Sequence, residues 1–248
     1  GILFSDTEKC NIYENYALSG TDIWIDDGLS PQLNVVVDTF TVATPTDYYV
    51  HPIGNISFDI ANHAVNPIVQ NVYVDPAGSN NNNGTSSSPL KTISYAMLAA
   101  YANSGLPCTI HLADGTYSPS TNGEYFPLGG KGYVSFAGMS QAGTIINGDS
   151  LTSIFYFEDN EEITISNLTI TNGYNPYYGG SGIYVKSTNL TLDSVTVSYN
   201  VSEGNSGGGI LVTATENNLS SINVQNSIIT DNTANRGAGI SINENYEC

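Results

Sequence analysis

The feature that most constrains the fold is a strand pattern that occurs three times in the second half of the chain. Within each copy apolar residues alternate with polar ones, which is typical of short strands that bury one face. The copies are Ile163-x-Ile165-x-x-Leu168-x-Ile170, Leu190-x-Leu192-x-x-Val195-x-Val197 and Ile222-x-Val224-x-x-Ser227-x-Ile229. A second motif lies between them, as Gly182-Ile-Tyr-Val185, Gly209-Ile-Leu-Val212 and Gly239-Ile-Ser-Ile242. Both motifs return at a nearly constant interval of about 30 residues, which is typical of repeat architectures.

This period favours a β-solenoid over a β-sandwich, because a sandwich does not repeat its sequence at a fixed interval. In a solenoid each strand pairs in parallel with its copy one coil later, and equivalent side chains stack in ladders. Four buried aliphatic side chains contribute about 6–12 kcal/mol per coil, most of which the ordering of the chain offsets. We therefore predict an all-β solenoid of several coils. Its buried ladders should contain Ile165, Leu168, Ile170, Leu192, Val195, Val197, Val224 and Ile229.

An asparagine follows the strand pair in each copy. Asparagine tolerates the left-handed backbone conformation that tight corners need. Asn200 and Asn232 stand in the same register, whereas Asn172 is one position early. We expect a stacked asparagine ladder in these two coils. The sequence does not decide whether Asn172 extends the ladder to the third coil.

Residues 72–128 read as the start of the solenoid. Apolar residues at Ile93, Ala96, Met97, Ala100 and Tyr101 have helical spacing, and they predict an amphipathic helix near 93–103. Ser88-Pro89 would cap its beginning. Such a helix would cover the open apolar end of the first coil, whose strand and corner we place at 109–117.

This region resembles a known superfamily. The motifs are Tyr73-Val-Asp-Pro-x-Gly78, Ser88-Pro-x-Lys-Thr-Ile93 and Thr109-Ile-His-Leu-Ala-Asp-Gly-Thr-Tyr117. They are similar to the first module of bacterial right-handed parallel β-helix proteins of the pectin-lyase-like superfamily. The resemblance covers about residues 72–248. It implies a right-handed parallel β-helix and a secreted bacterial protein, but it says little about activity, since one fold carries many functions.

The two ends of the chain match each other at one constant offset. Gly1, Ile2, Phe4 and Cys10 correspond to Gly239, Ile240, Ile242 and Cys248. With the preceding coil as the guide, and therefore at a different offset, the segment 10–17 also aligns with 227–234. We interpret this as one period of a tandem array or head-to-tail filament, with these eight residues as its assembly ends. The alternative is chance, because any two solenoid coils resemble each other.

The sequence thus predicts three parts. Residues 1–27 would be the terminal coils of a preceding repeat, 28–71 a β connecting segment, and 72–248 the β-helix with its capping helix. In the connecting segment, 35–42 and 56–60 alternate like half-buried strands, and the sequence does not decide how they are arranged.

Charge excludes several classes of partner. The formal net charge is −18, with only five lysines and arginines. Such a chain has no basic surface for nucleic acid or for an anionic membrane. No apolar run approaches the length of a membrane span, so we expect no membrane insertion.

Candidate chemistry is sparse. A lyase would need a base with arginine or calcium, but Arg236 is the only arginine. A hydrolase would need converging carboxylates, and neighbours such as Glu161 and Glu162 point to opposite sides of a strand. We interpret the acidic corner 158–162 and the loop 75–84 as solvated, with loose calcium binding as the alternative. We therefore predict no catalytic residues, no metal and no cofactor.

Aromatic and sulfur-containing residues give two further predictions. Tyr174, Tyr177 and Tyr178 lie in a corner loop, where they would contact a glycan or pack against the solenoid or a neighbour. Cys10 and its copy Cys248 fall at inward positions, so we expect them, like Cys108, to be buried free thiols. The alternative is a disulfide, which a secreted context permits.

Together these observations favour a non-catalytic structural repeat of a bacterial extracellular surface fibre, sheath or adhesin. Its main partner would be itself, through the ends of the β-helix. The alternative is a β-helix that binds or degrades an extracellular polysaccharide, as a lyase or a hydrolase.

Overall fold

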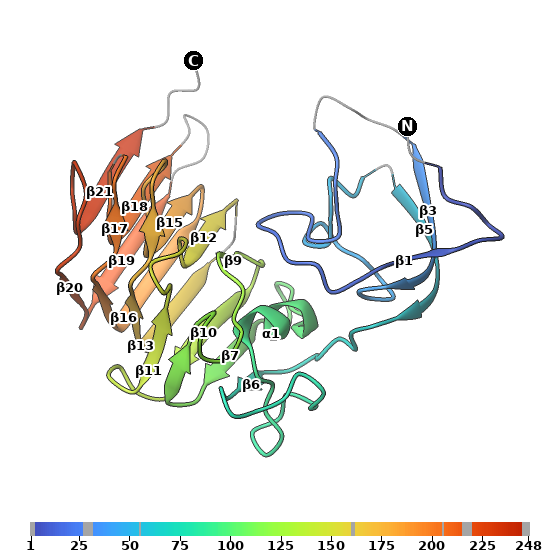
Figure 1. The fold of residues 1–248 in the computed structure, drawn as a ribbon, viewed down its shortest axis with the longest axis horizontal. Coiled ribbons are helices and arrows are strands. Elements are labelled where there is room, and N and C mark those ends of the chain that lie inside the picture. The colour runs from blue at the N-terminus through green and yellow to red at the C-terminus, as the bar shows by residue number, and fades with distance from the viewer. Residues whose placement is uncertain are drawn as a thin grey trace. The chain divides into compact units, whose positions relative to one another are not determined.

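The computed structural model describes residues 3–26, 32–54, 56–159, 162–204, 206–214 and 220–244 (Figure 1). It divides into two compact units, Gly1–Pro67 and Ile68–Cys248. Both are built from parallel strands.

The larger unit is a parallel β-solenoid with two main sheets. The first contains, in spatial order, β19 (Ser221–Gln225), β16 (Asn189–Ser198), β13 (Ile163–Thr171), β10 (Val134–Gly138), β7 (Cys108–Leu112) and β6 (Val72–Val74). It also includes β8 (Gly115–Tyr117), β11 (Thr144–Asn147) and β20 (Ile228–Thr230). The second contains β21 (Ile240–Glu244), β18 (Ile210–Ala214), β15 (Ile183–Lys186), β12 (Phe155–Glu158) and β9 (Leu128–Gly129). A short pair, β14 (Tyr174–Asn175) and β17 (Val201–Ser202), lies at a corner.

The sequence repeats are the coils of this solenoid. Strand β13 pairs with β16 so that Ile165 lies opposite Leu192, and Leu168 opposite Val195. The parallel β-helix prediction is therefore confirmed. Every predicted ladder residue on β13 and β16 is completely buried. Val224 is 37% exposed and Ile229 is half-buried, because both lie in the last described coil.

Phenylalanines fill the core of the earlier coils. Phe136, Phe155 and Phe157 are buried, and their ring centroids lie 5.2 to 6.4 Å apart. Such packing adds about 0.5–1.5 kcal/mol per ring pair to the burial itself. Aromatic rings fill the inward ladders of these earlier coils, and aliphatic side chains fill the ladders of the later coils.

The asparagine ladder forms in the two coils with matching register. Asn200 Nδ2 donates to Asn232 Oδ1 at 2.9 Å, and Asn200 Oδ1 accepts from the Gly173 backbone N–H at 2.8 Å. Gly173 thus holds the ladder position in the third coil. The left-handed conformation belongs to the preceding residues, Tyr199 with φ 55° and Asp231 with φ 54°. The expectation that the corner asparagines carry it was wrong for these two, whose side chains instead satisfy backbone groups inside the corner. It was right for Asn172, which has a φ of 55°.

Helix α1 (Ile93–Ala99) lies at the β6 end of the larger unit (Figure 1). It is shorter than the predicted 93–103. Ala100 is extended and bridges Ile68, and the Tyr101 N–H donates to the Ile68 carbonyl at 3.0 Å. Strand-like pairing therefore ends the helix. Its N-cap is Thr92, which accepts from the Tyr95 N–H at 3.2 Å, and not the predicted Ser88-Pro89.

Two charged side chains from a later coil hold the helix at both ends. The carboxylate of Glu124 accepts from the N–H groups of Ile93 and Ser94 at 2.8 and 2.7 Å. The ammonium of Lys131 donates to the Met97 carbonyl at 2.9 Å. Each charge matches the helix dipole and satisfies groups that the helix leaves unpaired. Burial raises the pKa of Glu124, although these hydrogen bonds oppose the rise, and burial lowers the pKa of Lys131 to about 7.

The smaller unit also consists of parallel coils. Strand β3 (Leu33–Phe40) pairs with β1 (Cys10–Ile12) on one side and β5 (Ile56–His63) on the other. Strand β2 (Ile23–Trp24) pairs with β4 (Val50–His51). Strands β3 and β5 of the expected connecting segment thus form one parallel sheet with β1 of the preceding segment. The division between the two units falls after Pro67, close to the start of the β-helix that was predicted at residue 72.

The lowered pKa of Lys131 predicts how stability depends on pH. Between pH 7 and 10.5 the unfolded chain keeps a proton on this lysine that the folded chain has released. The contribution of Lys131 to the free energy of unfolding therefore rises with pH across this window. Lys131→Met removes the titration. Urea denaturation should show that the stability of the wild type relative to Lys131→Met increases from pH 7 to about pH 10.

Lys91→Met, in the same unit, is the control. Its stability is measured against the wild type over the same pH range. Parallel pH curves for the wild type and Lys131→Met would contradict the prediction.

Candidate functional site

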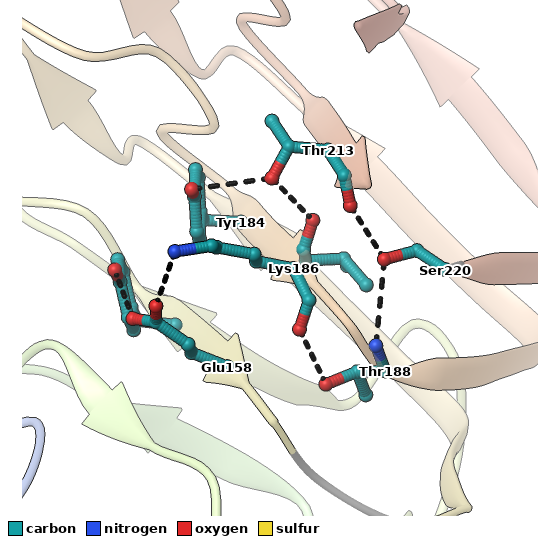
Figure 2. Close-up of polar contacts among 8 residues, drawn as sticks. Glu158, Tyr184, Lys186, Thr188, Thr213 and Ser220 are labelled. Carbon is teal, nitrogen blue, oxygen red and sulfur yellow. Dashed lines mark hydrogen bonds and ion pairs between the residues drawn. The ribbon is translucent and has the colours of Figure 1, made fainter. Parts of the chain in front are cut away.

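A polar cluster lies on the outer face of the second sheet. Alternate residues of β12, β15 and β18 point away from the core, and parallel register places equivalent residues side by side. Tyr156 lies opposite Tyr184, and Glu158, Lys186 and Thr213 follow one another across three strands (Figure 2). We call these five residues the outer-face cluster.

The cluster contains a ring stack and an ion pair. The rings of Tyr156 and Tyr184 are stacked, with centroids 4.5 Å apart and an interplanar angle of 10°. Glu158 Oε1 lies 2.7 Å from Lys186 Nζ, and Glu158 Oε2 accepts from the Tyr156 hydroxyl at 2.7 Å. Burial, and then the hydrogen bond to Glu158, raise the pKa of Tyr156. The hydrogen bond to Glu158 raises the pKa of Lys186.

Hydrogen bonds continue the cluster toward the next coil. The Tyr184 hydroxyl and Thr213 Oγ1 lie 3.2 Å apart, and the Ser220 hydroxyl donates to the Thr213 carbonyl at 2.5 Å. Ser220 Oγ in turn accepts from the Thr188 N–H at 3.4 Å, and the Thr188 hydroxyl donates to the Lys186 carbonyl at 2.9 Å (Figure 2).

This arrangement joins successive coils instead of exposing a reactive group. Both oxygens of Glu158 are occupied, so its carboxylate has a structural contact on each side. The prediction that residues 158–162 are a solvated corner was therefore wrong for Glu158, because register brings it against Lys186 of the next coil. Glu162 is exposed as expected, and Glu161 lies outside the described residues.

The three predicted glycan-contact tyrosines lie together in one corner. Tyr174 begins β14, and its hydroxyl donates to Glu203 Oε2 at 2.9 Å. Tyr177 and Tyr178 are 73% and 74% exposed, and their centroids lie 6.3 Å apart. Asn175 Oδ1 accepts from both of their backbone N–H groups, at 3.0 and 2.9 Å. The loop therefore presents two tyrosines to solvent on a fixed backbone.

The last described coil leaves apolar residues uncovered. Ile240 and Ile242 of β21 continue the ladder of Ile210 and Val212, which are buried. They are 37% and 74% exposed, and Ile228 is 54% exposed. Among the other predicted assembly ends, Phe4 and Gly239 are half-buried, whereas Gly1, Ile2 and Cys248 lie outside the described residues.

Cys10 is exposed, and only Cys108 is a buried free thiol among the described cysteines. The expectation of burial was wrong for Cys10, because β1 is the outermost strand of its sheet and no described strand covers its other side.

The coil at residues 10–25 has the same local geometry as the coil at 227–242. Glu14 and Asp231 have φ of 53° and 54°, and Gly20 and Gly237 have φ of 56° and 50°. A Cβ on Gly20 or Gly237 would lie 2.4 or 2.5 Å from the carbonyl oxygen three residues later. Glu14 and Asp231 are separated by the same number of residues as positions 10 and 227 in the sequence alignment, and so are Gly20 and Gly237. The two segments therefore follow one coil template.

A metal site and a membrane-spanning helix find no geometric support among the described residues. In this part of the chain, histidine, cysteine and carboxylate side chains do not gather in groups of three or more that could hold a metal ion. None of the described helices has the length and apolarity that crossing a bilayer requires. The loop at 75–84 has a structural role, since Asn80 Oδ1 accepts from the N–H groups of Lys91 and Thr92.

The outer-face cluster was not foreseen from the sequence. Its signal was the alignment of Tyr156-Phe-Glu158 with Tyr184-Val-Lys186 in consecutive coils, which places an acid beside a base and a ring beside a ring.

Comparisons with known proteins extend this description. A family profile described as "Protein of unknown function (DUF1565)" matches residues 76–248. A curated relative, "Uncharacterized protein YwoF" of Bacillus subtilis (strain 168), is 30% identical over 105 residues. That match covers 40% of this chain and 21% of the relative, so the chain spans about a fifth of the relative's length. No solved structure matches the chain.

The Glu158–Lys186 ion pair should contribute little to stability. Its side chains are 35% and 19% exposed, so solvent screens the attraction. A double-mutant cycle with Glu158→Gln and Lys186→Met should give a coupling energy below about 1 kcal/mol. Chemical denaturation of the four proteins measures this value. A coupling energy of about 3 kcal/mol or more would show that the pair behaves as a buried one.

Proposed function

The chain belongs to the DUF1565 family, and we propose that it is a non-catalytic structural repeat of a bacterial surface fibre, sheath or adhesin. Successive copies join head to tail through the ends of their coils. The repeat resides outside the cell. The parallel β-solenoid fold of the chain is the basis of this proposal.

The observation that carries the proposal is the uncovered end of the last described coil. Strand β21 offers Ile240 and Ile242 where earlier coils bury Ile210 and Val212. The edge strand also has backbone groups that face away from β18. An open edge of this kind is a template for another strand. A further coil of the same type would cover both the apolar side chains and the backbone.

The coil at residues 10–25 has the geometry to be the matching partner. It repeats the positive-φ positions of the coil at 227–242, at a constant spacing. Its strands β1 and β2 are outermost in their sheets among the described strands. Contact between two different surfaces is heterologous, so it does not close and propagates as a fibre.

Two observations support a non-catalytic role. Within the outer-face cluster, Lys186 and Tyr156 both bind the carboxylate of Glu158. This carboxylate is therefore not free to act as a general base. The asparagine-rich loop at 75–84 satisfies backbone groups around α1. These polar residues therefore hold the coils together.

A second candidate function is binding of an extracellular polysaccharide. The exposed pair Tyr177 and Tyr178 favours it, because aromatic faces pack against sugar rings and hydroxyls bond to their edges. Asn175 holds the loop, which reduces the entropy lost on binding.

The assembly proposal predicts that one substitution at the open end prevents association. Ile242→Arg places a charge where the next coil must pack, and it leaves the buried ladders unchanged because Ile242 is 74% exposed. Sedimentation velocity should show polymers of the 248-residue chain that grow with concentration, and Ile242→Arg should sediment as a monomer.

Ser241→Arg is the matched control, since Ser241 is the neighbouring residue on β21 and points to the other face. It should polymerise like the wild type. A wild-type chain that stays monomeric at every concentration tested would contradict the assembly proposal. Normal polymerisation of Ile242→Arg would contradict it as well.

A further inference from the structure

A groove of about 430 Å³ lies on the outer face of the first sheet, where β6, β7 and β10 end. Its volume is within the range of small-molecule sites, roughly 300–1,000 Å³. The lining includes Tyr73, Asp75, Ser86, His111 and Met139. All of them belong to the larger unit and lie apart from the open end and from the outer-face cluster.

An interruption in an outward ladder creates this groove. Tyr73, His111 and Ala137 are opposite one another in three adjacent strands. The rings of Tyr73 and His111 stack, with centroids 4.9 Å apart and an interplanar angle of 19°. On the other side of His111 the ladder continues with only the methyl group of Ala137. One face of the imidazole is therefore left without a stacking partner in the ladder.

Neighbouring hydrogen bonds define which nitrogen of a neutral His111 ring carries the proton. Asn71 Oδ1 accepts from the Thr109 N–H at 3.0 Å, which turns the amide nitrogen toward His111. That nitrogen lies 3.2 Å from Nε2, and an amide N–H only donates. Nε2 is therefore the acceptor, and the neutral ring carries its proton on Nδ1. Nδ1–H remains available as a donor.

The groove combines this ring with polar groups and apolar surface. Asp75 Oδ1 accepts from the Ala77 N–H at 2.8 Å, which leaves lone pairs of the carboxylate for a ligand. Ser86 adds a hydroxyl, and Pro89 and the 75% exposed Met139 add apolar surface. A carboxylate in the groove and a net charge of −18 oppose an anionic ligand.

We propose that this groove binds a neutral sugar residue of a polysaccharide. The C–H face of the sugar packs on the imidazole in place of the missing ring at Ala137. Hydroxyls at its edge donate to Asp75 and accept from His111 Nδ1–H. A flat aromatic ligand would fill the space but would leave these polar groups unpaired, at a cost in affinity. The site is independent of head-to-tail assembly.

Filling the gap in the ladder tests the proposal. The probes are cello-, manno-, xylo- and laminari-oligosaccharides, titrated into the native chain by calorimetry, with galacturonate oligomers and a tyrosine-containing peptide as comparisons. At least one neutral series should bind. Ala137→Phe should weaken that binding by at least about tenfold, and His111→Ala should do the same. Both sites are on the outer face, and circular dichroism would check that each variant folds.

Ser166→Phe is the matched control, because Ser166 holds the next position of the same ladder beyond Ala137. It should leave affinity unchanged. Three results would each overturn the inference: no binding of any neutral series, unchanged binding to Ala137→Phe, or preferential binding of galacturonate or the peptide. Sedimentation of the same variants reports separately on assembly.

Discussion

Parallel, in-register pairing between coils is the interaction on which the rest of this structure depends. It gives each side chain the equivalent residue of the next coil as its neighbour. Inside, this stacks Leu168 on Val195 without a gap. At a corner it stacks Asn200 on Asn232, and each amide satisfies backbone groups of the coil beside it. A single rule therefore sets the core, the corners and the outer faces.

In-register pairing also explains why the two ends of the solenoid have to be covered by something other than the repeat itself. A coil always presents the template for another coil, so the ladder has no intrinsic stop. At the β6 end, helix α1 covers the first coil, and Glu124 and Lys131 hold it with charges matched to its dipole. At the β21 end the last described coil has Ile242 exposed instead. In the proposed head-to-tail contact, a coil of another copy would cover this side chain.

On the outer faces, ladders that are continuous and ladders that are interrupted have different consequences. Where Glu158 meets Lys186 and Tyr156 meets Tyr184, neighbouring coils satisfy each other and the surface is closed. Where His111 is followed by Ala137, a ring face and its polar surroundings are left for a ligand. The proposed binding site thus arises from a change of residue size along one ladder.

The sequence by itself determined the coils, because a regular repeat with alternating apolar positions has only one way to bury every copy. The ladders at Leu168 and Val195 and the two-coil asparagine register follow from that spacing. Contacts that cross from coil to coil outside the repeat were decided only by the tertiary structure. Glu124 reaches the N–H groups of a helix in an earlier part of the chain, and pairing with Ile68 ends that helix at Ala99. Local propensity contains no information on such contacts, since they depend on how the irregular loops between strands return to the coil before.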